Sequence, residues 1–172
     1  MQRSFVSLSP QEALQVAISI EERNAEIYHR FAELFTEFGD EESLEIAAVF
    51  WEMAVEERAH RSLLRDKYAE LYGDSVCHIT EQDVIEIVEV PRLENGDVFA
   101  AGTDRAPGRI RALNVALQAE LRAQQFYLNL VDRTPRGPLH SLFQDLAQIE
   151  DSHVSYLGAK LVQDTAERPS VH

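Results

Sequence analysis

Two copies of the motif Glu-x-x-His occur in this 172-residue chain, one in each half. The first runs from Glu57 to His60 and the second from Glu150 to His153. Residues three apart lie on one face of a helix, so each motif projects a carboxylate and an imidazole side by side. The repeat predicts two helices that present the same pair of side chains.

A lone glutamate precedes each motif on another segment with helical periodicity. These residues are Glu21 and Glu120, and each stands seven residues before a tyrosine, Tyr28 or Tyr127. One glutamate from each of two helices, with Glu-x-x-His from two others, forms the inward-facing ligand set of a dinuclear iron or manganese site. The sequence therefore predicts an all-α four-helix bundle with this site inside.

The first two helices have clear start and stop signals. Ser9 is the expected N-cap of the first, with Pro10 at its first position, and the helix is expected to end near Gly39. The second is expected to begin at Asp40, with an acidic first turn, and to end at Gly73. The turn between them is short, which predicts antiparallel neighbours.

The third helix is expected over Arg109 to Val131, and the fourth is expected to begin at Thr134-Pro135 and to give way to a tail after about Glu167. The stretch from Asp74 to Gly108 differs, because five residues in it break any long helix: Pro91, Gly96, Gly102, Pro107 and Gly108. Within it, Val84 to Val90 fits either a short strand or one or two helical turns. A link this long predicts a crossover, which would make the second and third helices parallel.

The position of the six motif residues is stronger evidence than the motif itself, because a single Glu-x-x-His arises readily by chance. All six fall on apolar stripes, midway along their helices. A buried carboxylate costs several kcal/mol unless it is paired or bound to metal. Two divalent cations would remove that cost, and carboxylate oxygen with imidazole nitrogen suits iron or manganese. We therefore expect two metal ions in the chain, with iron as the first choice and manganese as the alternative.

Composition excludes several classes of function. The formal net charge of -14 argues against binding to nucleic acid or to an anionic membrane. Cys77 is the only cysteine, so neither an internal disulfide nor a cysteine-based zinc or iron site is expected. No stretch approaches the ~20 apolar residues of a membrane span, and Met1 to Ser9 do not resemble a signal peptide. These features predict a single cytoplasmic domain over residues 1–172.

Further polar residues lie near the expected ligands. Tyr28 and Tyr127 fit core packing, hydrogen-bond support of a ligand, or a radical relay. Asn24 and Gln124 lie one turn from the lone glutamates and fit either ligand support or the flank of a helix. Glu56 would be a ligand only if the register slipped by one residue, so it is expected to be a neighbour of the site. No catalytic side chain is predicted beyond the metal centre itself.

This pattern resembles the ferritin-like superfamily and is most similar to rubrerythrin-type proteins. The resemblance runs from about Ser9 to Leu161 and includes both Glu-to-Tyr spacings. It implies that Glu21 and Glu120 are terminal ligands, one on each metal. It further implies that two glutamates bridge the metals and that one histidine caps each metal, with Glu57 and Glu150 as the bridges and His60 and His153 as the caps.

The chain departs from that family pattern in two places. Rubrerythrins proper carry a rubredoxin-like domain with two Cys-x-x-Cys pairs, which the 172 residues do not contain. They also have an extra glutamate one turn after the third-helix ligand, where this chain has Ala123 followed by Gln124. A rubrerythrin-type peroxidase cycle is therefore in question, and electrons would have to come from a separate donor.

The resemblance implies an oxidoreductase that reacts with O2 or peroxide at a dinuclear centre, as in peroxide detoxification. Two alternatives stay open. One is iron handling, in which the chain oxidises Fe(II) and stores it or passes it on. The other is oxygenation of a substrate, for which the sequence names no pocket. The resemblance also implies a homodimer.

Overall fold

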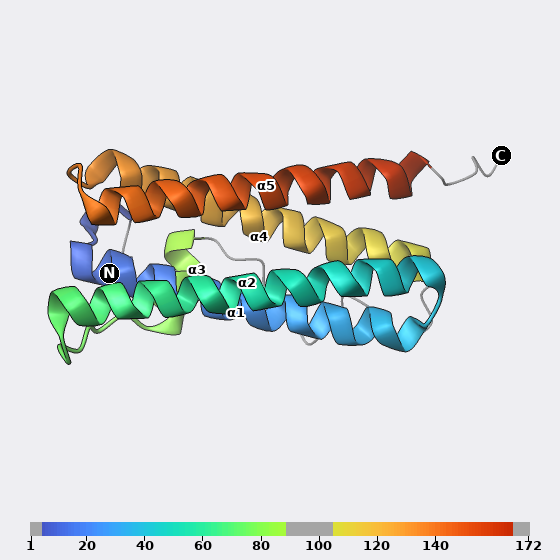
Figure 1. Cartoon of the computed structure of the whole chain (residues 1–172), viewed down its shortest axis with the longest axis horizontal. Helices are drawn as coiled ribbons and strands as arrows, with labels where there is room; N and C mark the ends of the chain where they lie inside the picture. The colour runs from blue at the N-terminus through green and yellow to red at the C-terminus, as the bar shows by residue number, and fades with distance from the viewer. Residues whose placement is uncertain (1–4, 89–104, 167–172) are drawn as a thin grey trace.

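The computed structural model describes residues 5–88 and 105–166, and all of its regular structure there is helical. A short 3-10 helix, η1 (Phe5–Ser7), precedes α1 (Pro10–Phe38) and α2 (Glu41–Tyr72). The short helix α3 (Glu81–Val88) is followed by α4 (Arg105–Arg133) and α5 (Pro138–Ala166). The four long helices form the predicted bundle (Figure 1).

Local sequence signals set both ends of α1. The Ser9 hydroxyl accepts a hydrogen bond from the Glu12 N–H at 3.2 Å, and the Glu12 carboxylate accepts one from the Ser9 N–H at 2.9 Å. This reciprocal pair satisfies N–H groups that have no partner within the helix. At the other end Gly39 adopts a left-handed conformation, with φ of 71°, that terminates the helix. Both predicted limits are confirmed.

The limits of α2 are confirmed as well. The Asp40 side chain accepts a hydrogen bond from the Ser43 N–H at 3.0 Å and so caps the first turn. Gly73 follows the last helical residue with φ of 58°. The Ser43 hydroxyl, which also donates to Asp40, lowers the pKa of that carboxyl, and nearby Arg109 acts in the same direction.

The link between the two hairpins is partly helical. Residues 81–88 form α3, so the strand alternative for this region is wrong. Thr80 and Asp83 form a capping box, in which the Thr80 N–H donates to the Asp83 carboxylate at 2.9 Å. The residues from 89 to 104, with Pro91, Gly96 and Gly102, lie outside the described part of the chain.

Two predicted helix starts need correction. α4 begins at Arg105, four residues before the predicted Arg109, because a proline in the first turn loses no helical hydrogen bond. α5 begins at Pro138 and not at Thr134-Pro135. The Thr134 N–H still donates to the Leu130 carbonyl at 2.9 Å, so Thr134 belongs to the end of α4. Three residues later, Gly137 precedes Pro138, the first residue of α5.

The helices are arranged as two antiparallel hairpins, α1 with α2 and α4 with α5 (Figure 1). α2 ends at one end of the bundle and α4 begins at the other, so these two helices run in the same direction. The predicted crossover topology is thereby confirmed. α3 packs beside α1 and α4 at the crossover. No helix in the described ranges has an apolar stretch long enough to cross a bilayer.

The apolar core is divided into two clusters. One contains Leu14, Leu64, Tyr127 and Phe143, and the other contains Phe35, Phe50, Leu113 and Leu157. In the second cluster the Phe50 ring stacks on the ring of Phe35 at a centroid distance of 5.8 Å. Glu21, Glu57, Glu120 and Glu150 are buried as deeply as these residues but belong to neither cluster. The middle of the bundle is therefore polar.

Arg109, near the start of α4, forms ion pairs with the start of α2 and the end of α5. Its guanidinium lies 2.7 Å from the Glu42 carboxylate, 3.6 Å from Asp40 and 3.5 Å from Asp164, and the side chain is only 13% exposed. We expect Arg109→Met to lower the free energy of unfolding in urea by roughly 2 kcal/mol, because it leaves partly buried carboxylates without their partner. The control Arg30→Met removes an exposed pair with Glu26 and should cost less than about 0.5 kcal/mol. Equal losses in both variants would contradict this role.

Candidate metal centre

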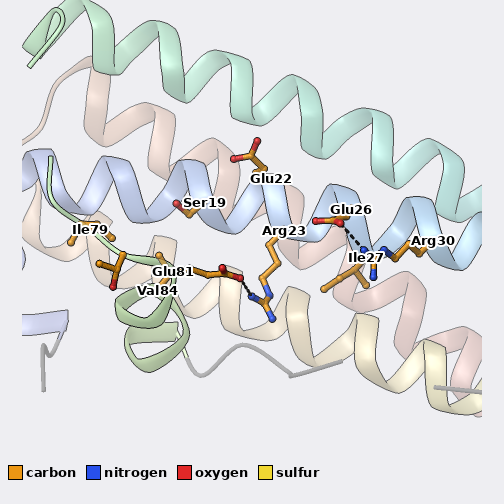
Figure 2. Close-up of a pocket in the computed structure, with 10 residues that line it drawn as sticks. Ser19, Glu22, Arg23, Glu26, Ile27, Arg30, Ile79, Glu81 and Val84 are labelled. Atoms are coloured by element: carbon orange, nitrogen blue, oxygen red, sulfur yellow. Dashed lines mark hydrogen bonds and ion pairs between the residues drawn. The ribbon is translucent and has the colours of Figure 1, made fainter. Parts of the chain in front are cut away.

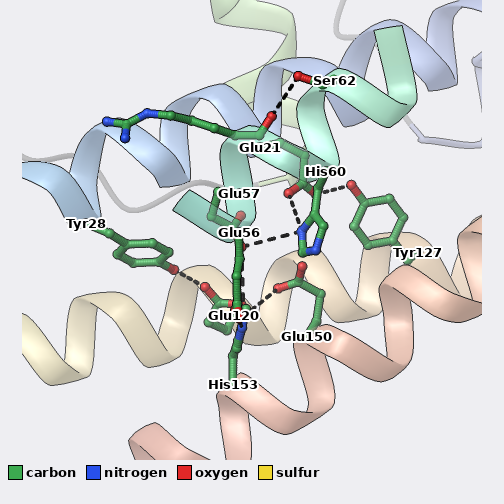
Figure 3. Close-up of polar contacts among 11 residues, drawn as sticks. Glu21, Tyr28, Glu56, Glu57, His60, Ser62, Glu120, Tyr127, Glu150 and His153 are labelled. Atoms are coloured by element: carbon green, nitrogen blue, oxygen red, sulfur yellow. Dashed lines mark hydrogen bonds and ion pairs between the residues drawn. The ribbon is translucent and has the colours of Figure 1, made fainter. Parts of the chain in front are cut away.

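All six predicted ligands lie in the middle layer of the bundle. Glu21 comes from α1, Glu57 and His60 from α2, Glu120 from α4, and Glu150 and His153 from α5. The four glutamates are 0% exposed and His60 is 6% exposed. The helical spacing of three residues turns each Glu and His of a motif toward the same interior (Figure 3). The structure thus brings together every residue that the sequence singled out as a ligand.

The six side chains form two overlapping groups, each with ligand atoms within 4.8 Å of one another. The first group is Glu21, Glu57, His60 and Glu150, and the second is Glu57, Glu120, Glu150 and His153. Glu57 and Glu150 belong to both groups. Two overlapping groups that share two carboxylates could hold two cations side by side.

Glu57 lies midway between the two histidines. Its Oε1 is 3.7 Å from Nδ1 of His60 and 3.8 Å from Nδ1 of His153. The same ring nitrogens also face the lone glutamates, at 3.2 Å from His60 to Glu21 and 3.2 Å from His153 to Glu120. In both halves it is therefore Nδ1 that points into the cluster.

The shared carboxylates lack hydrogen-bond donors. Both side-chain oxygens of Glu57 and both of Glu150 are buried without a hydrogen-bond partner among the described residues. An ionised carboxylate in that position costs several kcal/mol, and a neighbouring carboxylate cannot donate to it. Four such oxygens that converge from two helices fit bound cations, which would supply the missing positive charge. The donor set of hard oxygens and imidazole suits iron or manganese.

Without cations, protons take over part of that role. Burial raises the pKa of Glu57 and of Glu150 well above the usual range, and Glu21 and Glu120 beside them act in the same direction. Burial alone would raise the pKa of Glu120, but the neighbouring Glu150 and His153 outweigh it and lower the pKa of Glu120. Burial lowers the pKa of His153, whereas its bonds to Glu120 and Glu56 raise it, with a net result of about 9.

The two tyrosines support the lone glutamates in a crossed arrangement. The Tyr28 hydroxyl donates to Glu120, and the Tyr127 hydroxyl donates to Glu21. Each tyrosine thus serves the glutamate of the other half. The crossing follows from the antiparallel course of α1 and α4. Because the two helices run in opposite directions, the tyrosine of each helix lies at the same level as the glutamate of the other. Burial raises the pKa of both tyrosines, which keeps their protons available for donation.

The other sequence candidates have different positions. Asn24 is buried, at 2% exposure, but its Nδ2 has no hydrogen-bond partner among the described residues. Gln124 donates to Asp151 at 2.8 Å, and Asp151 is not one of the predicted ligands. Sequence reasoning underestimated Glu56, whose carboxylate lies 2.7 Å from Nε2 of His153. Its place beside Glu57 gave no signal of that contact, which depends on how α2 lies against α5.

A separate surface cavity of about 470 Å³ lies between α1 and the start of α3 (Figure 2). None of the six predicted ligands lines it. The arginines there already pair with carboxylates, Arg23 with Glu81 at 3.3 Å and Arg30 with Glu26 at 2.8 Å. The cavity therefore offers neither an unpaired charge for a substrate nor a direct connection to the carboxylate cluster.

Residues 12–95 match the Rubrerythrin family model. This segment contains the first lone glutamate and the first Glu-x-x-His motif. No curated protein matches the chain.

The chain is also similar to a solved structure, an uncharacterised conserved protein from Magnetospirillum magnetotacticum MS-1. The two share 22% sequence identity with a TM-score of 0.71, over 96% of this chain and 100% of that one. At this identity the likeness shows the fold alone, and it extends that fold over both hairpins. Residues 12–95 are thus similar to the rubrerythrin family, and the described chain folds as a ferritin-like helical bundle.

Proposed function

We propose that this protein is an oxidoreductase that reduces peroxide or O2 at a dinuclear iron centre in the middle of the bundle. One observation carries the proposal: the four unpartnered oxygens of Glu57 and Glu150 lie where two groups of possible ligands overlap. The rubrerythrin match over residues 12–95 supports the same chemistry.

The two groups suggest the role of each residue. Glu21 and His60 would hold one iron, Glu120 and His153 would hold the other, and Glu57 and Glu150 would lie between them. Two ferrous ions, when bound, can supply the two electrons that convert hydrogen peroxide and two protons into two molecules of water.

The surrounding residues keep this layer dry and ordered. Tyr28 and Tyr127 hold one oxygen of each lone glutamate, which fixes the orientation of the other oxygen and keeps a proton nearby. Apolar clusters on both sides exclude water from the layer. His153 keeps 11% of its side chain exposed, so the cluster meets solvent at that edge.

The second departure from the family pattern concerns Ala123. This residue is 0% exposed and packs in the apolar cluster with Tyr127 and Phe143. A methyl group there offers no fifth carboxylate, so any reduction of peroxide by this chain depends on the six ligands. The 172 residues contain no Cys-x-x-Cys pair, and we therefore propose a separate electron donor.

Iron handling is the second candidate. Glu56 is 54% exposed and contacts His153, so its carboxylate lies between solvent and the edge of the cluster. Such an edge would suit entry of Fe(II), and the net charge of -14 would attract cations. Under this alternative the same six ligands would oxidise iron that is then stored or released.

Iron loading followed by sizing separates the two candidates. We expect a dimer that holds about two irons per chain and consumes peroxide over many turnovers with an added reductant. The measurements are light scattering, elemental analysis and peroxide decay. A large cage that retains many irons per chain and stops consuming oxidant once Fe(II) is spent would instead indicate storage.

Loss of a shared carboxylate should prevent binding of the metal pair. We expect Glu57→Ala and Glu150→Ala each to bind fewer than two irons per chain while the far-ultraviolet circular dichroism stays close to wild type. The control Glu22→Ala alters an exposed residue that pairs with Arg61 and should keep full stoichiometry. Full metal content in both variants would refute the ligand assignment.

Cation binding should release protons. His153, with a pKa of about 9, holds a proton near neutral pH in the metal-free chain, and the raised pKa values of Glu57 and Glu150 favour their protonated forms. Ligands must be deprotonated, so the affinity for Mn²⁺ should rise with pH by about tenfold per unit for each displaced proton, up to the pKa of about 9 of His153. Calorimetry in buffers of different ionisation enthalpy measures that release. An affinity that does not change between about pH 6 and pH 8 would contradict the assignment.

A further inference from the structure

Glu56 stands just outside the cluster and contacts only one of the two histidines in it. Its Oε2 lies 2.7 Å from Nε2 of His153, while Nδ1 of the same ring faces Glu120 at 3.2 Å (Figure 3). Glu56 comes from α2 and His153 from α5. The contact therefore links the two helical hairpins at the exposed edge of the site.

The geometry of this contact suits control of the ring. A separation of 2.7 Å is typical of a charge-assisted hydrogen bond, in which Nε2–H donates to the carboxylate. A histidine whose outer nitrogen donates to a carboxylate is held in one tautomer and one orientation, with the lone pair of the other nitrogen free for a cation. For His153 that nitrogen is Nδ1, which points at Glu57, Glu120 and Glu150.

The equivalent position in the other half of the repeat holds no acceptor. Glu56 is the residue immediately before the glutamate of the first motif, and the equivalent residue in the second motif is Ile149. An isoleucine side chain accepts no hydrogen bond, so it cannot do for His60 what Glu56 does for His153. The two halves otherwise match closely, since each contributes a lone glutamate, the Glu and His of one motif, and one of the crossed tyrosines.

We propose that Glu56 is a positioning residue that orients His153 and makes the two cation subsites unequal. The subsite of Glu120 and His153 is the tighter one, and that of Glu21 and His60 is the weaker. The inference rests on the proposed function only in that both place divalent cations among these six ligands. It adds that the first cation binds at the subsite of Glu120 and His153, an order that the repeated motif alone does not predict.

Titration of the metal-free chain with Co²⁺ tests this proposal, because the visible absorption of Co²⁺ reports its coordination. We expect wild type to bind two ions with different affinities. Glu56→Ala should weaken the tighter step by about 10- to 100-fold and leave the weaker step nearly unchanged. Glu56→Gln should stay close to wild type, because its amide oxygen still accepts from Nε2–H.

Two controls separate an effect through the His153 ring from an effect of negative charge alone. Glu52→Ala removes the same charge one turn earlier on the exposed side of α2 and should leave both steps nearly unchanged. In a His153→Ala background Glu56→Ala should have no further effect, whereas in a His60→Ala background it should keep its full effect. Coupling to His153 alone shows that Glu56 acts through that ring.

Several results would overturn the inference. One is an equal loss in Glu52→Ala, and another is an effect of Glu56→Ala that persists without His153. A loss in Glu56→Gln as large as in Glu56→Ala would make Glu56 a direct ligand instead. If wild type binds two Co²⁺ ions in unequal steps but the iron form consumes no peroxide, only the redox function fails. A wild-type chain that binds no cation overturns both.

Discussion

Burial of four carboxylates in one layer is the constraint on which the rest of this structure depends. Each would cost several kcal/mol in an apolar interior without a partner. The chain meets this cost unevenly, because Glu21 and Glu120 receive tyrosine hydroxyls and histidine nitrogens, whereas Glu57 and Glu150 receive no donor among the described residues. Hydrogen bonds within the protein thus fix Glu21 and Glu120, whereas Glu57 and Glu150 are available to bind protons or cations. That division explains why a bundle of this size has a polar centre between two apolar clusters.

The crossover topology makes this layer possible. Because α1 and α4 are antiparallel, a Glu-to-Tyr spacing of seven residues on each helix yields two reciprocal hydrogen bonds between the hairpins. The same two helices therefore support each other's ligands, and neither hairpin contains a complete group by itself. Arg109 provides a further link at the end of the bundle, where it joins the starts of α2 and α4 to the last part of α5. Assembly of the site and docking of the hairpins are in this sense one event.

Local interactions explain why much of the fold was predictable. The Ser9 capping box, the Asp40 cap and the glycine at position 39 act within one helical turn, so their sequence signals correctly gave the limits of α1 and α2. The errors arose where two local signals competed. Thr134-Pro135 and Gly137-Pro138 both offer a start for α5, and the continuing hydrogen bond from Thr134 to Leu130 decided between them. Likewise Pro107 was taken as a breaker, although proline is compatible with the first turn of a helix.

The sequence by itself determined the helices, the six candidate ligands and their place on the inner faces, because helical periodicity fixes which residues share a face. It also implied the rubrerythrin-like character of the chain through the repeated motif. Only the tertiary structure decided how the halves meet. The crossed tyrosine pairs, the shared position of Glu57 and Glu150, and the contact of Glu56 with His153 all join residues of different helices. Such contacts depend on the distance and register between helices, and the spacing of residues along a single helix does not determine either.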